Sequence, residues 1–124
     1  MQFAAISGAI AVILGALGAH ALKGKLTPEL LSSFETGVKY QMYHSILLAL
    51  LFILLEKHHL PFLKKAGYCF IAGICMFSGS IYLLSTRSLS GLENISFLGP
   101  VTPLGGLTLI AGWLLMFVAF TKKT

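Results

Sequence analysis

Four long apolar stretches, joined by short polar connections, constrain this chain more than any other feature of its sequence. The stretches cover residues 3–22, 38–55, 67–86 and 101–120. Because an α-helix rises about 1.5 Å per residue, roughly 20 apolar residues cross the ~30 Å hydrocarbon core of a bilayer. Short connections make consecutive spans antiparallel neighbours. The sequence therefore predicts an all-α integral membrane bundle of four transmembrane helices, with residues 1–124 forming one domain.

The composition excludes a soluble enzyme. Charged residues make up only 10% of the chain and hydrophobic residues 56%, whereas about 25% of residues are charged in typical soluble domains. The spans use most of the 124 residues, so no catalytic domain fits outside the bilayer. The sequence also contains no nucleophile elbow, phosphate loop or paired carboxylates. We therefore expect a protein that is not an enzyme, with no catalytic residues, no cofactor and no metal site.

The basic residues indicate what the chain binds. Lys and Arg number nine against four acidic residues, and they lie near the ends of the apolar stretches. A nucleic-acid-binding protein would gather such residues in a patch interleaved with aromatic side chains, so we exclude nucleic acid as a partner. Lysines at span ends anchor helices at the membrane surface and attract anionic head groups. We expect the lipid bilayer as the partner, with anionic lipids at the basic loop 56–66 and at the C-terminus.

The same charges predict an orientation in the membrane. With an even number of spans, the N-terminus, the loop 56–66 and the C-terminus share one side. That side carries Lys57, Lys64, Lys65, Lys122 and Lys123, and the other side carries Lys23, Lys25, Lys39 and Arg87. Because positive residues are enriched in cytoplasmic loops, five against four favours both termini inside the cell. The margin widens to five against three if Lys39 lies within a helix.

A helix start precedes the second apolar stretch. Thr27 suits an N-cap, Pro28 suits the first helical position and Glu29 is favourable in the first turn. Leu30, Leu31 and Phe34 follow with the spacing of an apolar helix face. The pattern predicts a short amphipathic helix between spans one and two that runs into the second span.

Small residues form a stripe along the first span. They are Ala4, Gly8, Ala11, Gly15 and Gly18, which recur at intervals that fall on one helix face. Small residues let two backbones approach closely, so such stripes mark helix contacts inside membranes. We interpret the stripe as packing within the bundle. Association into a homo-oligomer, or with a partner membrane protein, is an open alternative.

Polar side chains gather on the second and third spans. Gly37, Tyr40, Gln41 and His44 share one face of span two, and Cys75, Ser78, Tyr82 and Ser85 share one face of span three. Polar groups inside a membrane are costly and mark functional sites. We expect the two faces to meet in a polar pocket that opens to one membrane surface, with Thr102 nearby. The candidate binding residues are Tyr40, Gln41, His44, Ser78, Tyr82 and Thr102.

Two hypotheses of different classes follow from these residues. In the first, the pocket makes the protein a non-enzymatic membrane module that binds a small molecule, a lipid or a partner helix. In the second, His20 and His44 lie at similar depth and serve a small transporter or a proton, haem or metal component. His44 also has a simpler interpretation as a buried side chain with a hydrogen bond near Tyr40. Glu35 is a second-rank candidate that is expected to form an i, i+4 ion pair with Lys39.

Several segments resemble a known family. They are residues 15–23 (GALGAHALK), 40–45 (YQMYHS), 77–82 (FSGSIY) and 99–106 (GPVTPLGG), followed by Gly112 and Trp113. In this order they resemble the small uncharacterised inner-membrane family of the YgdD type. The resemblance implies a polytopic protein of the bacterial plasma membrane, and it supplies no catalytic residues. Residues 88–96 do not share the pattern.

Overall fold

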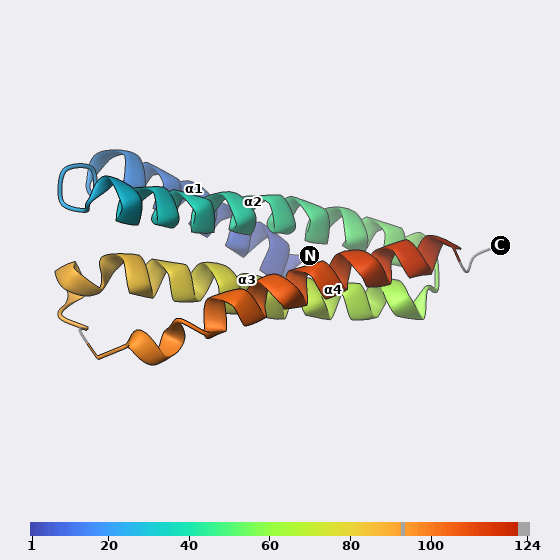
Figure 1. The fold of residues 1–124 in the computed structure, drawn as a ribbon. Helices are drawn as coiled ribbons and strands as arrows, with labels where there is room; N and C mark the ends of the chain where they lie inside the picture. Colours follow the sequence, from blue (N-terminus) through green and yellow to red (C-terminus); the bar gives the residue numbers. More distant parts are fainter. Residues whose placement is uncertain (93, 122–124) are drawn as a thin grey trace.

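The computed structural model of the chain is a bundle of four long α-helices (Figure 1). It describes residues 1–92 and 94–121. The helices are α1 (Gln2–His20), α2 (Pro28–Lys57), α3 (Pro61–Ser90) and α4 (Val101–Thr121), and a single 3-10 turn, η1 (Ser96–Leu98), precedes α4. All four α-helices are long and apolar enough to cross a membrane. The predicted all-α membrane fold is confirmed.

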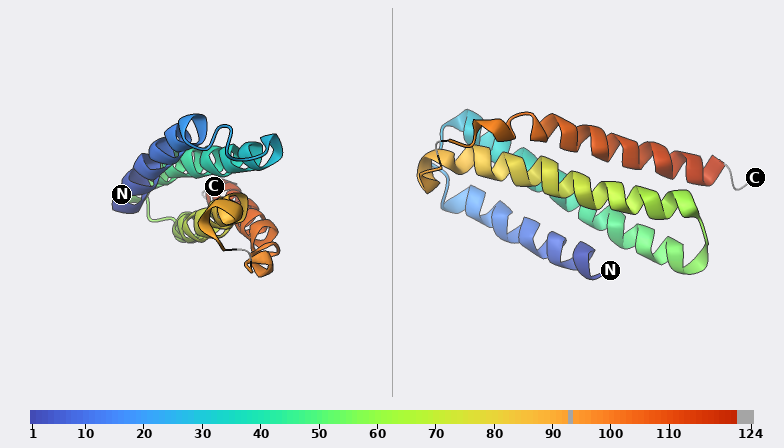
Figure 2. Two further views of the ribbon diagram at one scale, coloured as in Figure 1. Left: turned by 90° about the vertical axis from the view of Figure 1, so that its left-hand side faces the viewer. Right: turned by 90° about the horizontal axis from the view of Figure 1, so that it is seen from below.

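The helices form two layers that lie one above the other (Figures 1 and 2). In one layer α1 packs on α2, in the other α3 packs on α4, and the contact between α2 and α3 joins the layers. Backbones of α1 and α3 do not approach each other, nor do those of α2 and α4. Any contact between α1 and α3, or between α2 and α4, is therefore made by side chains.

The start of α2 and its continuation into the second span agree with the sequence. The Thr27 hydroxyl accepts a hydrogen bond from the backbone N–H of Leu30 at 3.3 Å, and Pro28 opens the helix. The expected amphipathic helix runs into the second span without a break, because residues 28–57 form one helix of 30 residues. After Pro28 the chain has no proline before Pro61, so nothing breaks the helical hydrogen bonds between the amphipathic turns and the span.

Helix α3 is also longer than its apolar stretch. It begins with Pro61 at its first position and ends at Gly91, whose φ of 70° is left-handed. Glycine adopts this conformation without the steric cost that other residues meet, so it commonly ends helices. With 30 residues, α3 rises about 45 Å. Both α2 and α3 therefore exceed the roughly 30 Å thickness of the hydrocarbon core.

Glycines bring α3 and α4 into the closest contact of the bundle. A Cβ atom added at Gly105 would collide with the backbone of Phe77, and one at Gly73 or Gly112 would collide with Leu109 or Phe70. These glycines are buried. Without side chains at these positions the two backbones pack at a distance that even alanine would prevent.

The small-residue stripe of α1 packs on α2. A Cβ added at Gly8 would lie 3.8 Å from Ser45 Cβ, and one at Gly18 would lie 3.2 Å from the Phe34 ring. Ala4 and Ala11 are buried as well. This contact supports the interpretation of the stripe as packing within the bundle, and it sets the register in which Gly8 lies level with Ser45.

Candidate functional site

A buried hydrogen-bond network joins α1, α2 and α3. Gln41 on α2 is at its centre: its Nε2 donates to the carbonyl oxygen of Ser7 at 2.9 Å, and its Oε1 accepts from the Tyr82 hydroxyl at 2.7 Å. Ser45 donates to the Ser7 hydroxyl at 2.7 Å and is also within 2.7 Å of the Gln41 carbonyl oxygen. Because buried polar groups need partners, this network fixes how α1 and α3 sit across α2.

The network forms the floor of a hollow between α1 and α3. The hollow has a volume of about 210 Å³ and is lined by Phe3, Ile6, Ser7, Ile10, Gln41, Ile74, Cys75, Gly79 and Tyr82. We call it the α1–α3 groove. Most of the lining residues are apolar, and the polar ones besides Cys75 are Ser7, Gln41 and Tyr82, of which Ser7 and Gln41 are buried. The groove lies between two helices whose backbones do not meet.

The depth of Gln41 along α2 differs from what the span boundaries suggest. The sequence places the second span at residues 38–55, with Gln41 near its start, and predicts a pocket that opens to one membrane surface. Gln41 is the fourteenth of the 30 residues of α2, so it lies near the middle of this helix rather than at its end. The opening of the pocket to a membrane surface stays a prediction.

Two other candidate residues do not line this groove. Ser78 is fully buried, and its hydroxyl donates to the carbonyl oxygen of Gly37 at 2.7 Å. Thr102 on α4 shares a 2.6 Å hydrogen bond with Ser80 on α3. It borders a separate hollow of about 320 Å³ near Ser85 and Arg87. Ser78 and Thr102 therefore hold helices together, at positions outside the groove.

His44 on α2 contacts both α3 and α4, and Tyr40 lies beside it one helical turn earlier. The His44 ring is buried among Tyr40, Phe70 and Trp113, with ring centroids 5.4 to 6.3 Å away. Its Nδ1 is 2.7 Å from the Tyr40 carbonyl oxygen, and its Nε2 is 3.3 Å from Trp113 Nε1. Tyr40 itself is 41% exposed and packs on Phe77. The six candidate residues thus form a series of contacts rather than one pocket.

The second-rank candidates also differ from expectation. His20 is the exposed last residue of α1. Gly8, which lies level with Ser45, precedes it by 12 residues, a rise of about 18 Å. The expectation that His20 and His44 lie at similar depth is therefore wrong, and they cannot ligate one metal ion. Within residues 1–92 and 94–121, no three His, Cys, Asp or Glu side chains are grouped so as to hold a metal.

The expected ion pair is not formed either. The side chains of Glu35 and Lys39 are exposed, and both border a hollow of about 210 Å³ beside Gly15 and Gly18. Exposed pairs gain little from association, because water solvates each charge separately. Glu35 therefore has no role in the network around Gln41.

Three residues of these contacts, Ser7, Ser45 and Trp113, are not among the predicted site residues. Ser7 is the single hydroxyl residue of α1, and this isolated polar position in an apolar helix was the available signal. Ser45 follows Gln41 by one helical turn, which places both on the face toward α1. Trp113 carries an indole N–H that needs an acceptor where it is half-buried. Each of the three was therefore detectable by asking for the partner of a polar group.

Comparison with known proteins places these contacts in a family. The family model described as "Protein of unknown function (DUF423)" matches residues 14–106, which is most of the chain. The chain belongs to this family. The matched region contains Gln41, His44 and Tyr82, whereas Ser7 and Trp113 lie outside it.

Curated relatives extend the similarity to nearly the whole chain. UPF0382 membrane protein YwdK of Bacillus subtilis is 42% identical over 119 residues, covering 95% of this chain and 92% of the relative. UPF0382 membrane protein SH2409 of Staphylococcus haemolyticus is 36% identical, with 98% of both chains covered. UPF0382 inner membrane protein YgdD of Escherichia coli is 37% identical over 94% of this chain and 84% of its own.

These similarities establish a membrane protein of the UPF0382 and DUF423 family. The resemblance seen in the sequence motifs is thereby confirmed. No solved structure matches the chain significantly.

Proposed function

We propose that the chain is a non-enzymatic binding protein of the bacterial inner membrane whose α1–α3 groove takes a lipid-soluble molecule that carries a hydroxyl group. The observation that carries this proposal is the polar floor of Ser7, Gln41 and Tyr82 at the base of an apolar groove. An acyl chain alone gains nothing from such a floor, whereas a lipid-soluble molecule with one polar group is matched by it.

The free hydrogen-bonding capacity of the floor indicates the ligand chemistry. The Tyr82 hydroxyl donates its proton to Gln41 Oε1, so its oxygen is left as an acceptor. The shorter bond from Gln41 Nε2 goes to the Ser7 carbonyl oxygen, and its approach to the Ser7 hydroxyl is 3.4 Å. A ligand hydroxyl can donate to Tyr82 and accept from Gln41. This pairing favours an alcohol over a hydrocarbon.

The second hypothesis, a proton, haem or metal component using two histidines, has less support. His20 lies about 18 Å along the bundle from His44, as the register of Gly8 and Ser45 implies. His44 also uses both ring nitrogens in contacts with Tyr40 and Trp113. A histidine that shuttles protons needs one nitrogen that exchanges with solvent or another titrating group.

Photolabelling tests the proposal directly. The protein is reconstituted in phosphatidylcholine vesicles with a long-chain alcohol that carries a diazirine, and labelled residues are located by peptide mass spectrometry. We expect labels on the segments of α1 and α3 around Ile10 and Gly79. A diazirine alkane of equal length without the hydroxyl should label this groove about fivefold less, the effect of one hydrogen bond in a membrane.

A matched pair of variants controls for general effects. Tyr82→Phe removes the acceptor in the groove, whereas Tyr43→Phe changes a tyrosine of α2 that is 61% exposed and outside the groove. Only Tyr82→Phe should reduce labelling by the alcohol. Equal labelling by both probes would contradict the proposal. So would crosslinks between two copies of the chain at the groove, because they would show that a second copy occupies it.

A further inference from the structure

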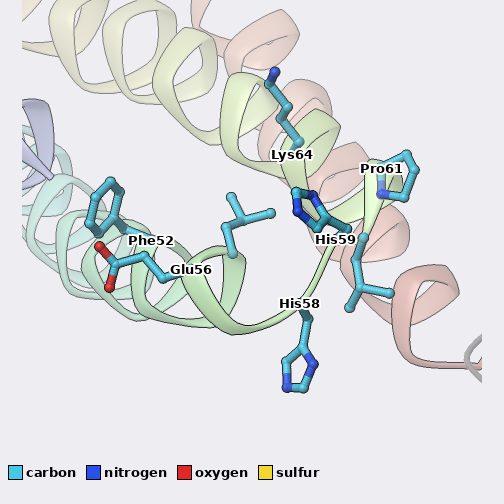
Figure 3. Close-up of a pocket in the computed structure, with 8 residues that line it drawn as sticks. Phe52, Glu56, His58, His59, Pro61 and Lys64 are labelled. Carbon is cyan, nitrogen blue, oxygen red and sulfur yellow. The ribbon is translucent and has the colours of Figure 1, made fainter.

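A hollow lies at the α2–α3 hairpin, away from the α1–α3 groove (Figure 3). It has a volume of about 500 Å³ and lies where α2 ends and α3 begins. Phe52, Leu55, Leu60 and Pro61 give it apolar walls, and its polar lining residues are Glu56, His58, His59 and Lys64. Figure 3 shows Glu56 beside Phe52 on α2, with Lys64 across from them on α3.

This hollow continues toward the N-terminus of α1. A second hollow of about 180 Å³ shares Phe52, Leu55 and Lys64 with the first, and it extends to Phe3 and Gly67. Lys64 therefore borders both hollows, and together they form one apolar trough that leads from the hairpin along the bundle. We call it the hairpin trough.

The trough lies at the depth of lipid head groups. Helix α1 has 19 residues, a length of about 28 Å that matches the hydrocarbon core. Its N-terminus lies part-way along the bundle, so the hairpin end of α2 and α3 extends beyond it (Figure 1). Since α2 and α3 are each about 45 Å long, their joined ends reach the interface between lipid tails and water.

The charge around the trough is positive. Lys57, Lys64 and Lys65 are within the hairpin, against the single carboxylate of Glu56. The Lys65 ammonium lies 5.5 Å from the centroid of the Phe62 ring, whereas Lys64 borders the hollows. Basic pockets at the ends of transmembrane helices bind anionic lipid head groups.

We propose that the hairpin trough binds one anionic phospholipid of the surrounding membrane. Lys64 holds the phosphate of the head group, and an acyl chain lies in the apolar hollows between Phe52 and Gly67. A free phosphate ion would use Lys64 but leave the apolar walls exposed to water. A phospholipid satisfies both the charge and the apolar surface.

Lipid retention measured by native mass spectrometry tests this site. The full chain is reconstituted in vesicles of equal parts phosphatidylglycerol and phosphatidylcholine, extracted in mild detergent, and analysed for retained lipid. We expect one retained phosphatidylglycerol per chain. Lys64→Gln should lower the ratio of retained phosphatidylglycerol to phosphatidylcholine about fivefold, the effect of one lysine near the membrane surface. Glu56→Gln should raise that ratio, because it removes the carboxylate nearest to the phosphate.

Lys23→Gln is the matched control, since this exposed lysine lies in the connection between α1 and α2 at the opposite end of the bundle. An equal loss in Lys23→Gln and Lys64→Gln would overturn the site, because it would show general attraction of a basic protein for anionic lipid. Unchanged retention in Lys64→Gln would overturn it too.

Two glycine variants separate this site from the proposed alcohol groove. A Cβ at either Gly67 or Gly79 meets no atom within 4 Å, so both positions accept a larger side chain that fills the space beside it. Gly67→Leu should reduce phosphatidylglycerol retention and leave photolabelling by the alcohol unchanged. Gly79→Leu should do the reverse. Because the two readouts are independent, one site can fail while the other holds.

Discussion

The indole Nε1–H of Trp113 on α4 points at Nε2 of His44 on α2 across 3.3 Å, although the backbones of these helices do not meet. The other nitrogen of the imidazole, Nδ1, is 2.7 Å from the carbonyl oxygen of Tyr40. A carbonyl only accepts and an indole N–H only donates, so both contacts require a neutral His44 with its proton on Nδ1. The imidazole thus links α4 to α2 by a specific tautomer.

Trp113→Phe should weaken this link without emptying the space. The variant keeps an aromatic ring against Phe70, which lies 5.8 Å from Trp113 between centroids, but it removes the donor to His44. We expect a loss of about 0.6 to 1.7 kcal/mol in the free energy of unfolding, as for hydrogen bonds between other membrane helices. Reversible unfolding in detergent, in a double-mutant cycle with His44→Phe, isolates this interaction. Strict additivity of the two variants would show that the bond contributes nothing.

The contact between α3 and α4 predicts different outcomes for two adjacent glycines. Gly105→Ala puts a Cβ into the backbone of Phe77, whereas Gly106→Ala puts one 3.7 Å from the Phe77 ring, an ordinary contact. Overpacking of this kind costs about 1 to 3 kcal/mol, so Gly105→Ala should lower the melting temperature clearly. Gly106→Ala should leave it nearly unchanged. Equal effects of the two variants would mean that helix propensity, not the close approach, determines the stability.

The sequence predicted the helices because apolar length and bilayer thickness are local properties. The four spans, the Thr27 cap and the start at Pro28 were all predictable in this way. The true length of α3 was not, since the turns before residue 67 and after residue 86 have no break and remain helical by propagation. Hydropathy marks where a helix can be buried in lipid, not where it ends.

The site was predictable only in part, because spacing along one helix does not give the register between helices. The face shared by Gln41 and His44 was identified, and so was the face shared by Ser78 and Tyr82. The actual partner of Gln41 on α1, Ser7, depends on Gly8 lying level with Ser45. That register is set by the packing of α1 on α2, and the same packing separates His20 from His44.

Gln41→Leu should release α1 from the bundle locally. The variant fills the same space but removes the bonds to Ser7 and Tyr82. Amide hydrogen exchange should become faster throughout α1, while α3 and α4 keep their protection. Thr108→Val is a suitable control, because the Thr108 hydroxyl bonds only to the Leu104 carbonyl within α4. Unchanged exchange in α1 would show that the small-residue stripe alone holds this helix.

The position of Lys39 within α2 bears on the orientation of the chain in the membrane. Lys39 is the twelfth residue of α2 and lies near the level of Gly15, since a Cβ at Gly15 would be 3.4 Å from Val38. It is therefore inside the span and does not count as a loop charge, although its long side chain extends toward the head groups. The balance becomes five lysines on the side of the termini against Lys23, Lys25 and Arg87. Lys122 and Lys123, which contribute to the five, lie outside the described residues.

A reporter fused after Thr124 should consequently be cytoplasmic, so a fluorescent protein should mature there and alkaline phosphatase should be inactive. Replacing Lys57, Lys64 and Lys65 with glutamine leaves two lysines against three basic residues, so this variant should produce a fraction of inverted chains. Adding Lys23→Gln and Lys25→Gln to this triple variant should reduce the fraction of inverted chains, because it removes positive charge from the opposite side. High phosphatase activity of the unmodified chain would contradict the orientation. It would also place the hairpin trough in the outer leaflet, where the site would bind phospholipids of that leaflet.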